Sequence, residues 1–469
     1  MSDLPQIPND AASASGLSRR ALIFTTAAAG AAALSGCASG APNRFADRDR
    51  LMAKRPENPK QPIKVGLVGC GGRGTGAALQ ALLAENGSVH LTAVGDTFAD
   101  RLEGCLGYLG AELARREEAT DDRPALEPGT YTDRLKVAEG RRFVGFQAFQ
   151  QVIDSGVDVV LLATPPAFRP AHLDYATKAG KHVFCEKPMA IDGPGIRSVI
   201  DSAARAKQQG TSLVSGFCWR YNRRHRAFFD QLHNGAIGDL RAVYTTYNTG
   251  AIGSRSRQEG WSDIEWQLRN WHHFSWLSGD HIVEQACHSI DKQAWAFEDR
   301  EPLSVVAVGG CQTRSGPEKG NTYDHFAATF DYGDGVKAFH MARQWANTDG
   351  ENNDYFYGSK GHGIIENWTP RHEFTGPGAW VYEGEGNDMY QQEHDELFAS
   401  IRLGQPINDG EWMIKSTQLA VMARMAAYTG KVVSWDAALN STERLGPESL
   451  AWGDYEYAPE PTPGVTPLV

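Results

Sequence analysis

The chain has 469 residues, of which 41% are apolar, and a formal net charge of −11. This length and composition suit two domains with sizeable hydrophobic cores. The acidic balance excludes a typical nucleic-acid-binding protein, because phosphate backbones are bound by basic patches. Beyond residue 60 there is no apolar run of the roughly 20 residues that cross a bilayer, and the six cysteines there form no CxxC pair. We therefore expect buried, unpaired cysteines and no bound metal.

The first sixty residues are predicted to lie outside the fold. Ser18, Arg19 and Arg20 precede an alanine-rich stretch over 21–36, a pattern that resembles a twin-arginine export signal. The sequence Leu-Ser-Gly-Cys that ends at Cys37 also resembles a bacterial lipobox, which would give the protein a lipid anchor; a plain cleaved signal is the alternative. Residues 1–36 are thus expected to be a signal peptide and 37–61 a tether, with the mature protein in the periplasm or cell envelope.

A glycine cluster follows the first strand-like run of the folded part. Residues 65–68 form a short apolar run, and the next six satisfy the pattern G-x-G-x-x-G: Gly69, Cys70, Gly71, Gly72, Arg73 and Gly74. In that pattern the first glycine makes a tight turn, the second admits a pyrophosphate, and the third lets the helix pack on its strand. A second strand over 90–95 ends in Asp96, which is placed to bind ribose hydroxyls. We expect NAD as the cofactor, with NADP as the alternative because Arg101 is nearby.

Alternating strands and helices continue to residue 218. Strands are predicted over 157–163, 182–185 and 212–217, with helices over 147–155, 171–179 and 195–208. This alternation predicts an open parallel sheet, so 62–218 is interpreted as a Rossmann dinucleotide-binding domain. Ligands bind beyond the carboxyl ends of such strands, where this chain has Thr164, Pro165, Glu186 and Lys187. The helical, acidic stretch over 100–142 is interpreted as an insertion without an assigned role.

The pattern changes after residue 218. Strand-like runs at 240–247, 303–308, 325–332, 336–343 and 355–357 are separated by few helices. They predict a mainly antiparallel open sheet. Helices at 393–402 and 413–429 make the region 219–457 an α+β substrate-binding domain, and the proline-rich residues 458–469 are expected to form a loose tail. The predicted fold class is therefore α/β: a Rossmann domain followed by an α+β domain.

One predicted helix carries polar residues suited to catalysis. Glu284, His288, Asp291 and Trp295 are spaced by 4, 3 and 4 residues, which places them on one face of a helix. A carboxylate one turn before a histidine fixes its tautomer and raises its basicity, as a general base requires. A structural helix with a satisfied histidine is the alternative.

Tryptophans are concentrated just before this helix, with four of them within residues 261–276. Large aromatic side chains serve both as core residues and as flat surfaces for ligands. We interpret this stretch as partly core and partly a wall for a sugar. The expected substrate contacts are Trp271, Asp291 and Tyr221.

These motifs together resemble the Gfo/Idh/MocA family, named after glucose-fructose oxidoreductase, inositol dehydrogenase and a rhizopine-catabolism protein. The resemblance covers about residues 62–450. It rests on the glycine cluster, on Thr164-Pro165, on Cys185-Glu186-Lys187-Pro188, and on the spacing of Glu284, His288 and Asp291.

The resemblance implies that Lys187 and His288 form a catalytic pair, with Glu284 orienting His288. It further implies hydride transfer between a nicotinamide cofactor and a secondary alcohol of a sugar, glycoside or cyclitol. The family usually has aspartate where this chain has Glu284, and the glycines near that helix start are reduced to Gly279. The resemblance therefore does not name the substrate.

Two other functions stay open on the sequence alone. One is a redox-neutral, NAD-dependent glycoside hydrolase, and the other is a non-catalytic sugar-binding or sensor protein. Export adds a condition, because little free nicotinamide cofactor is expected outside the cytoplasm, so an exported enzyme has to hold its cofactor tightly. The expected partners are a small sugar or cyclitol and a second copy of the chain in a homo-oligomer, with no nucleic acid.

Overall fold

The computed structural model describes residues 45–54, 61–84, 88–118 and 130–469. These residues all belong to one compact unit, Gly40–Val469. The predicted signal peptide and Cys37 lie outside the described residues. None of the helices in the described ranges is both long and apolar enough to cross a membrane. The cysteines from Cys70 onward are free, and all but Cys311 are buried, as expected.

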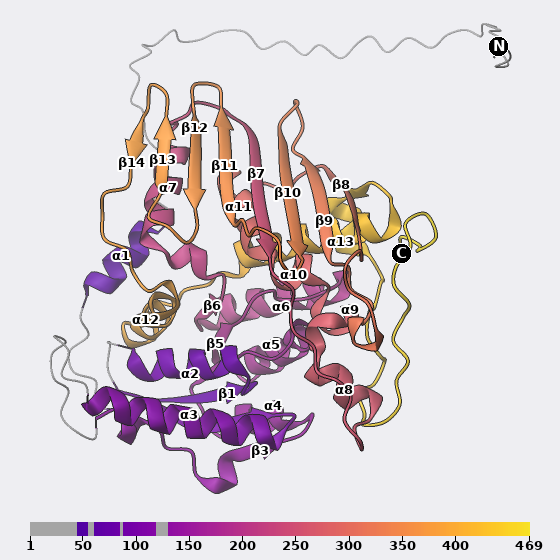
Figure 1. Ribbon diagram of the computed structural model, residues 1–469. Coiled ribbons are helices and arrows are strands. Elements are labelled where there is room, and N and C mark those ends of the chain that lie inside the picture. Colours follow the sequence, from indigo (N-terminus) through magenta and orange to yellow (C-terminus); the bar gives the residue numbers. More distant parts are fainter. Residues whose placement is uncertain (1–44, 55–60, 85–87, 119–129) are drawn as a thin grey trace, which may run out of the picture. The chain divides into compact units, whose positions relative to one another are not determined.

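The N-terminal domain is an open parallel sheet with the strand order β3-β2-β1-β4-β5-β6 (Figure 1). Its strands are β1 (Ile63–Val68), β2 (Val89–Asp96), β3 (Arg142–Val144), β4 (Val159–Leu162), β5 (His182–Cys185) and β6 (Leu213–Ser215). Its helices are α2 (Gly72–Leu83), α3 (Ala99–Glu118), α4 (Ala148–Asp154), α5 (Arg169–Lys178) and α6 (Gly193–Gln209). Strand β4 is buried along its whole length. This is typical of a parallel strand that is covered on both faces, as its apolar run predicted. The predicted Rossmann fold is confirmed.

The stretch predicted as an insertion is instead part of the Rossmann connection. Helix α3 occupies its first half and buries Leu102, Cys105, Leu109 and Leu113. The third strand, β3, follows and pairs in parallel with β2. This strand was not expected from the sequence, since it has three residues and two of them are exposed. The interpretation of 100–142 as an insertion is therefore wrong.

Part of the predicted tether is also folded. Helix α1 spans Ala46–Ala53, and Phe45 and Leu51 at its ends are buried. Arg48 forms ion pairs with Asp409 and Glu396, two carboxylates that are fully buried. Buried carboxylates need a cation, and Arg48 supplies it from upstream of the Rossmann domain. The tether prediction is therefore wrong for 45–54.

The C-terminal domain is a nine-stranded sheet with the order β14-β13-β12-β11-β7-β10-β9-β8-β15. Its strands are β7 (Leu240–Thr249), β8 (Ser304–Gly310), β9 (His325–Asp331), β10 (Lys337–Gln344), β11 (Asn353–Gly358), β12 (His362–Glu366), β13 (His372–Thr375), β14 (Trp380–Val381) and β15 (Val433–Ser434). Neighbouring strands are antiparallel except β7 and β10, which run parallel. The mainly antiparallel sheet is confirmed.

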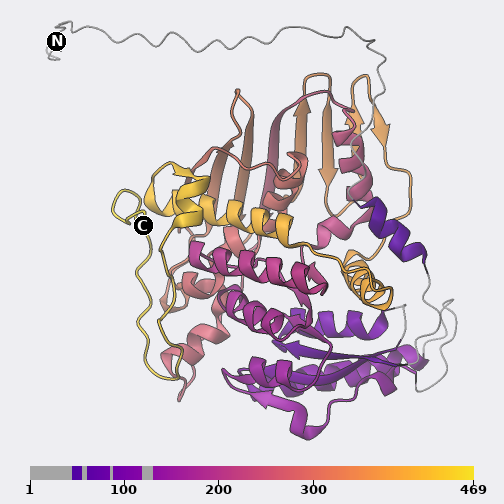
Figure 2. The same ribbon diagram turned by 180° about the vertical axis from the view of Figure 1, so that it is seen from behind.

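Helices connect the two sheets. The C-terminal domain contains α7 (Arg223–His233), α8 (Asp263–Arg269), α9 (Ser275–Ser278), α10 (His281–Glu284), α11 (Cys287–Ala296), α12 (Met389–Arg402), α13 (Gly410–Thr429) and α14 (Trp435–Asn440). Helix α13 is buried over most of its length. It packs against β8 on one side and α6 of the Rossmann domain on the other (Figure 2).

The last residues of the chain are docked rather than loose. The carbonyl oxygen of Ala458 accepts a hydrogen bond from Asn321, and that of Pro461 accepts one from Tyr323. Glu460 forms an ion pair with Lys319. These contacts satisfy backbone and side-chain groups that a sequence pattern cannot pair. The prediction of a loose tail over 458–469 is wrong.

Candidate active site

A cavity of about 730 Å³ lies just beyond the carboxyl ends of the Rossmann strands. Its wall includes the residues predicted for the cofactor and catalytic sites: Gly69, Gly71, Gly72, Arg73, Asp96, Thr164, Pro165, Glu186, Lys187, Trp271, Glu284 and His288. It is therefore shared by both domains. The remaining predicted residues, Cys70, Gly74, Tyr221 and Asp291, are not among the residues that line it.

The glycine loop has the shape that a dinucleotide requires. Gly69 has a φ of +94°, and a Cβ there would lie 2.8 Å from the backbone of Ala163. A Cβ on Gly74 would lie 1.8 Å from the Gly69 carbonyl oxygen, so this glycine lets α2 pack on its strand. In contrast, a Cβ on Gly71 or Gly72 would meet no protein atom within 4 Å. The protein thus leaves space at the N-terminus of α2, where unpaired N–H groups favour phosphate.

Asp96 ends β2 at the edge of this loop. Its carboxylate accepts hydrogen bonds from the backbone N–H groups of Cys70 (2.6 Å) and Phe98 (2.9 Å). Burial raises the pKa of Asp96, and the two N–H groups oppose that shift. Because both donors belong to the backbone, the carboxylate is held at the mouth of the cavity, where ribose hydroxyls bind in such folds. The loop and Asp96 therefore fit NAD.

Glu186 lies between the glycine loop and the C-terminal domain. The Arg73 guanidinium bonds to its carboxylate and, at 2.8 Å, to the carboxylate of Glu393 on α12. Burial raises the pKa of Glu393, while Arg73 lowers it. Glu186 also accepts from the backbone N–H of Lys187 at 3.1 Å. Glu186 thus ties the loop that carries Lys187 to α2, and the contribution of Glu393 was not expected from the sequence.

Glu284 and His288 do not share a helix. Helix α10 ends at Glu284, and α11 begins at Cys287. Two residues, Gln285 and Ala286, lie between these helices, and the φ of −117° at Gln285 departs from the helical value of about −63°. The carboxylate of Glu284 bonds to Nδ1 of His272 at 3.2 Å. The structure therefore does not support the prediction that Glu284 orients His288, because the carboxylate bonds to His272 and Nδ1 of His288 has no partner among the described residues.

His288 reaches the cavity from α11 and is partly exposed there. Its Nδ1 is buried and has no hydrogen-bond partner among the described residues. Burial and the nearby Lys187 hold the pKa of His288 well below its usual value. The ring is therefore neutral near pH 7 and available to accept a hydrogen bond or a proton.

Lys187 faces His288 across the cavity from the other domain. Its Nζ donates a hydrogen bond to the backbone carbonyl oxygen of Glu284. This contact joins the end of β5 to the end of α10. A lysine ammonium at this position can donate to a substrate oxygen and stabilise negative charge that develops on it.

Two predicted substrate contacts are buried elsewhere. Asp291 forms an ion pair with Arg220 at 2.8 Å and accepts from Ser416 at 2.6 Å. Tyr221 donates to Asp409 and accepts from Arg48 at 3.1 Å. Both side chains are buried and pair with charged groups away from the cavity lining, so the structure does not support them as substrate contacts. The helical spacing around Asp291 in the sequence did not reveal its distant partners.

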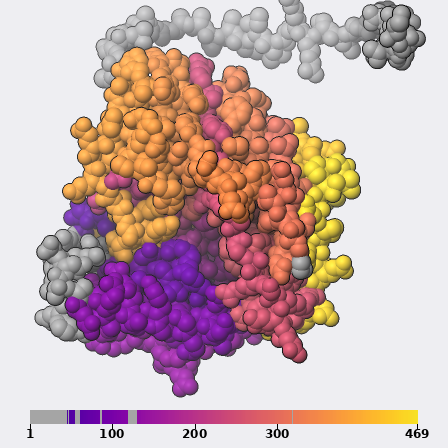
Figure 3. Space-filling view, in the orientation of Figure 1, coloured from indigo at the N-terminus to yellow at the C-terminus, as the bar shows by residue number. Residues whose placement is uncertain are grey.

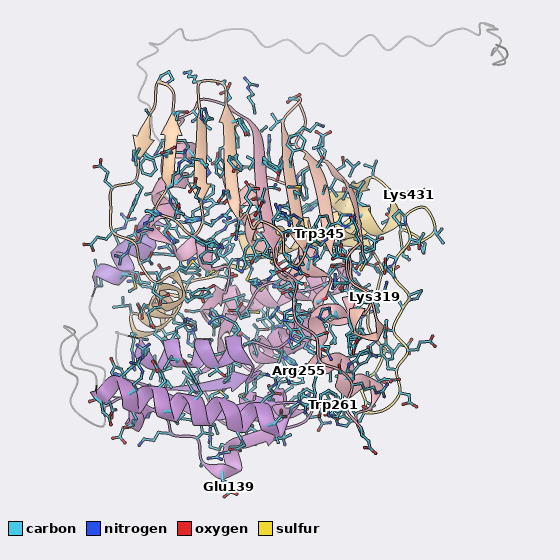
Figure 4. The ribbon with its side chains drawn as sticks, in the orientation of Figure 1. Glu139, Arg255, Trp261, Lys319, Trp345 and Lys431 are labelled. Carbon is cyan, nitrogen blue, oxygen red and sulfur yellow. The ribbon has the colours of Figure 1, made fainter. Side chains whose placement is uncertain are left out.

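Two segments of the C-terminal domain, α8 and residues 450–452, contact the Rossmann domain beside the cavity. We call these two segments the roof. Arg269 on α8 forms a two-bond ion pair with Asp100 of the Rossmann domain, at 3.0 and 3.1 Å. Trp452 packs on Phe146 with ring centroids 4.5 Å apart, and Leu450 lines the cavity. Figure 3 shows the rose-coloured segment around α8 against the purple surface of the Rossmann domain. Figure 4 marks Arg255 and Trp261 on the same segment.

Comparisons with known proteins agree with this architecture. A model of the oxidoreductase family with an NAD-binding Rossmann fold matches residues 63–215, and a model of the GFO/IDH/MocA C-terminal domain matches residues 225–363. The chain belongs to the GFO/IDH/MocA family. Membership confirms the Rossmann domain, its C-terminal partner and NAD as the cofactor class of the family.

Individual relatives are distant. Inositol 2-dehydrogenase of Rhizobium meliloti is 21% identical over 338 residues, which are 72% of this chain and 86% of that protein. The 2,7-anhydro-N-acetylneuraminate hydratase of Escherichia coli is 25% identical over 234 residues, 50% of this chain and 58% of that protein. The chain thus spans little more than half the length of that hydratase.

Solved structures share the fold. The aldose-aldose oxidoreductase from Caulobacter crescentus, crystallised with glycerol, superposes with a TM-score of 0.60 at 21% identity. The superposition covers 80% of this chain and 100% of that chain. At this identity the likeness concerns the fold.

Proposed function

We propose that the protein is an NAD-dependent oxidoreductase that transfers hydride between a secondary alcohol of a sugar, glycoside or cyclitol and a tightly held nicotinamide cofactor. The single observation that carries this proposal is the shared cavity. It joins the glycine loop and Asp96 to Lys187 and His288. The names of the relatives, an inositol dehydrogenase and an aldose oxidoreductase, support the same substrate class.

Each group of residues at the cavity has a separate role in this reaction. Gly69–Gly74 and Asp96 would hold NAD, which accepts or returns hydride when bound. Lys187 donates a hydrogen bond to the carbinol oxygen and stabilises its developing negative charge. His288, neutral because of its burial, takes the hydroxyl proton. Glu284 fixes the Lys187 ammonium through its backbone carbonyl group.

The experiment is to mix the NAD-loaded protein with candidate sugars, glycosides and cyclitols and to follow the absorbance of reduced nicotinamide. We expect reduction with at least one compound that carries a free secondary hydroxyl group. A protein that binds such compounds without any reduction would be a sugar-binding or sensor protein. A compound that is cleaved without net reduction would favour the redox-neutral hydrolase.

We also propose export and membrane anchoring, because the twin-arginine pattern and Cys37 precede the fold. Fractionation of the native host and mass spectrometry of the mature N-terminus test both. An N-terminus at Cys37 that carries a diacylglycerol group supports the anchor. An unprocessed protein in the cytoplasm contradicts both proposals.

Self-association is the third proposal in this group. The outer face of the C-terminal sheet exposes apolar side chains on β8, β10 and β11: Val306, Val308, Phe339, Met341 and Tyr357. An exposed apolar patch of this kind is typical of an interaction site. We expect light scattering to give at least a dimer and the double substitution Phe339→Glu, Met341→Glu to give a monomer. Val432→Glu, also at an exposed position, is the control.

A further inference from the structure

Four histidines line the cavity, His172, His272, His273 and His288, and His272 and His288 reach it from different elements. His288 comes from α11, and His272 comes from the turn Trp271–His273 that follows α8. Within the described residues, His272 alone among these four side chains bonds to a carboxylate, with its Nδ1 3.2 Å from Glu284. The His272 side chain is 34% exposed, whereas that of Glu284 is 6% exposed. The pair is thus anchored inside the protein and open toward the cavity.

The hydrogen bond fixes the state of the imidazole. Burial alone would raise the pKa of Glu284, but His272 and Lys187 bring it below its usual value. The carboxylate is therefore ionised and can only accept a hydrogen bond, so Nδ1 of His272 carries the hydrogen and Nε2 carries the lone pair. Trp271 stacks on the ring with centroids 3.6 Å apart. The imidazole is thus held in place by a carboxylate on one side and an indole ring on its face.

Hydride transfer does not use this base. Oxidation of one alcohol releases one hydroxyl proton, and Lys187 and His288 serve that oxygen in the function proposed above. Glu284 connects the two groups: its carbonyl oxygen holds Lys187, and its carboxylate holds His272. A cation that polarises a substrate carbonyl group is thus joined through one residue to a base beside it. That arrangement suits removal of a proton from the carbon next to the carbonyl group.

We propose that His272, positioned by Glu284, is a second catalytic acid–base group that removes and returns the C–H proton on the carbon adjacent to the substrate carbonyl. This inference rests on the proposed function, because the ketone is the product of alcohol oxidation. It gives the protein an enolisation activity in addition to hydride transfer.

The step balances without any oxidant or reductant. The C–H bond breaks, and its proton forms an N–H bond at Nε2 of His272. The electron pair moves into a new C=C bond, and the carbonyl oxygen becomes an enolate oxygen that accepts from Lys187. The reverse step returns a proton, which exchanges with solvent while it is on the imidazole.

The test separates proton exchange from hydride transfer. The protein loaded with NADH is first offered cyclitol ketones and keto-glycosides, and the ketone that it reduces becomes the probe. The protein loaded with NAD, which cannot reduce a ketone, is then incubated with this probe in D2O. Proton NMR follows the loss of the C–H signal next to the carbonyl group, against a protein-free blank.

We expect exchange at least about 10²-fold above the blank. His272→Asn should lower the ratio of exchange to reduction by at least about 10²-fold, and added imidazole should restore exchange in His272→Ala. Glu284→Gln should lower the exchange rate without raising the KM for the ketone, which separates positioning from binding. His362→Asn, an exposed histidine on β12, is the matched control.

Several results would overturn the inference. Reduction of the ketone without exchange above the blank leaves the proposed function intact and removes the role of His272. A ratio that falls in His288→Asn and not in His272→Asn assigns the base to His288 instead. If the NADH-loaded protein reduces no ketone, the proposed function fails, and this inference fails with it.

Discussion

The backbone carbonyl oxygen of Glu284 accepts a hydrogen bond from the ammonium group of Lys187, although the two residues are 97 positions apart and lie in different domains. The contact places a cation from the end of β5 at the break between α10 and α11. The same break sends the Glu284 carboxylate to His272 and leaves His288 free to face the cavity. The interruption of the helix at Gln285 therefore places Lys187, His272 and His288 around the same cavity.

Removal of Lys187 or His288 should abolish efficient hydride transfer. We expect Lys187→Ala and His288→Ala each to lower turnover by at least about 10²-fold, as is typical for the loss of a positioned acid–base group. The bound NAD content should stay near that of the wild type, since neither residue belongs to the glycine loop. Steady-state rates and nucleotide released by acid measure the two quantities.

The control for this prediction is Lys178→Ala, which removes an exposed lysine at the end of α5. It should turn over at the wild-type rate. If Lys187→Ala or His288→Ala also turns over at that rate, the residue concerned has no part in the chemistry.

The choice of NAD over NADP should depend on Asp96. A carboxylate at the end of β2 accepts from ribose hydroxyls and repels a 2′-phosphate group. We expect Asp96→Ser to lower the preference for NAD, measured on nucleotide-free protein as the ratio of the Kd values for NADP and NAD, by at least about 10-fold. The ratio is the informative quantity, because loss of the hydrogen bonds from Cys70 and Phe98 affects both nucleotides alike. A wild-type protein that comes from its host with NADP would contradict the assignment.

The sequence predicted those parts of the site that depend on local pattern. Gly69, Gly74 and Lys187 could be placed from the sequence because each lies next to a strand end with a recognisable turn. The contact of Glu284 with His272 could not be predicted from the sequence. The 4-3-4 spacing predicts a continuous helix, and the break at Gln285 has no strong sequence signal. His272 lies in a tryptophan-rich segment 12 residues before Glu284, and this separation fits no helical or strand pattern that would predict a contact.

Long-range charge pairing was also beyond the sequence pattern. Asp291 has the spacing of a site residue, yet its partner Arg220 lies 71 positions earlier and both are buried. A buried guanidinium group needs carboxylates to compensate for its lost hydration, and Asp291 and Asp299 supply them. Tyr221 is held in a similar way by Asp409. Such pairs become visible only when the fold brings the elements together.

Stability should fall as the pH falls below about 6.5. Burial lowers the pKa of His172, His340 and His394 to about 3, whereas an unfolded histidine titrates near 6.5. Between these two pKa values the unfolded state binds more protons than the folded state. Each of these histidines therefore lowers the unfolding free energy by at most about 1.4 kcal/mol for each pH unit of acidification. Denaturant unfolding at pH 7, 6 and 5 measures the slope.

Substitution of one buried histidine tests the cause of this slope. His340→Gln should reduce the pH dependence of the unfolding free energy by about one proton, even if it lowers stability overall. His362→Gln, at an exposed position, should leave the slope unchanged. Equal slopes in all three proteins would show that the buried histidine is not responsible.

The roof over the cavity should slow the release of NAD. Trp452 packs on Phe98 and Phe146, which line the cavity, and Arg269, which also lines it, forms an ion pair with Asp100. Retention for hours outside the cytoplasm requires a dissociation rate on the order of 10⁻⁴ s⁻¹. With an association rate constant of about 10⁶ M⁻¹s⁻¹, the Kd is about 0.1 nM.

We expect extensively dialysed protein to keep near-stoichiometric NAD and Trp452→Ala to release it at least about 10-fold faster. The matched control is Trp368→Ala, which removes a tryptophan that is 69% exposed and packs on Trp219, a residue that does not line the cavity. Mass spectrometry of acid-released nucleotide gives the content at each time. An empty wild-type protein after dialysis would contradict the tightly held cofactor, and equal release rates in all three proteins would contradict the role of the roof.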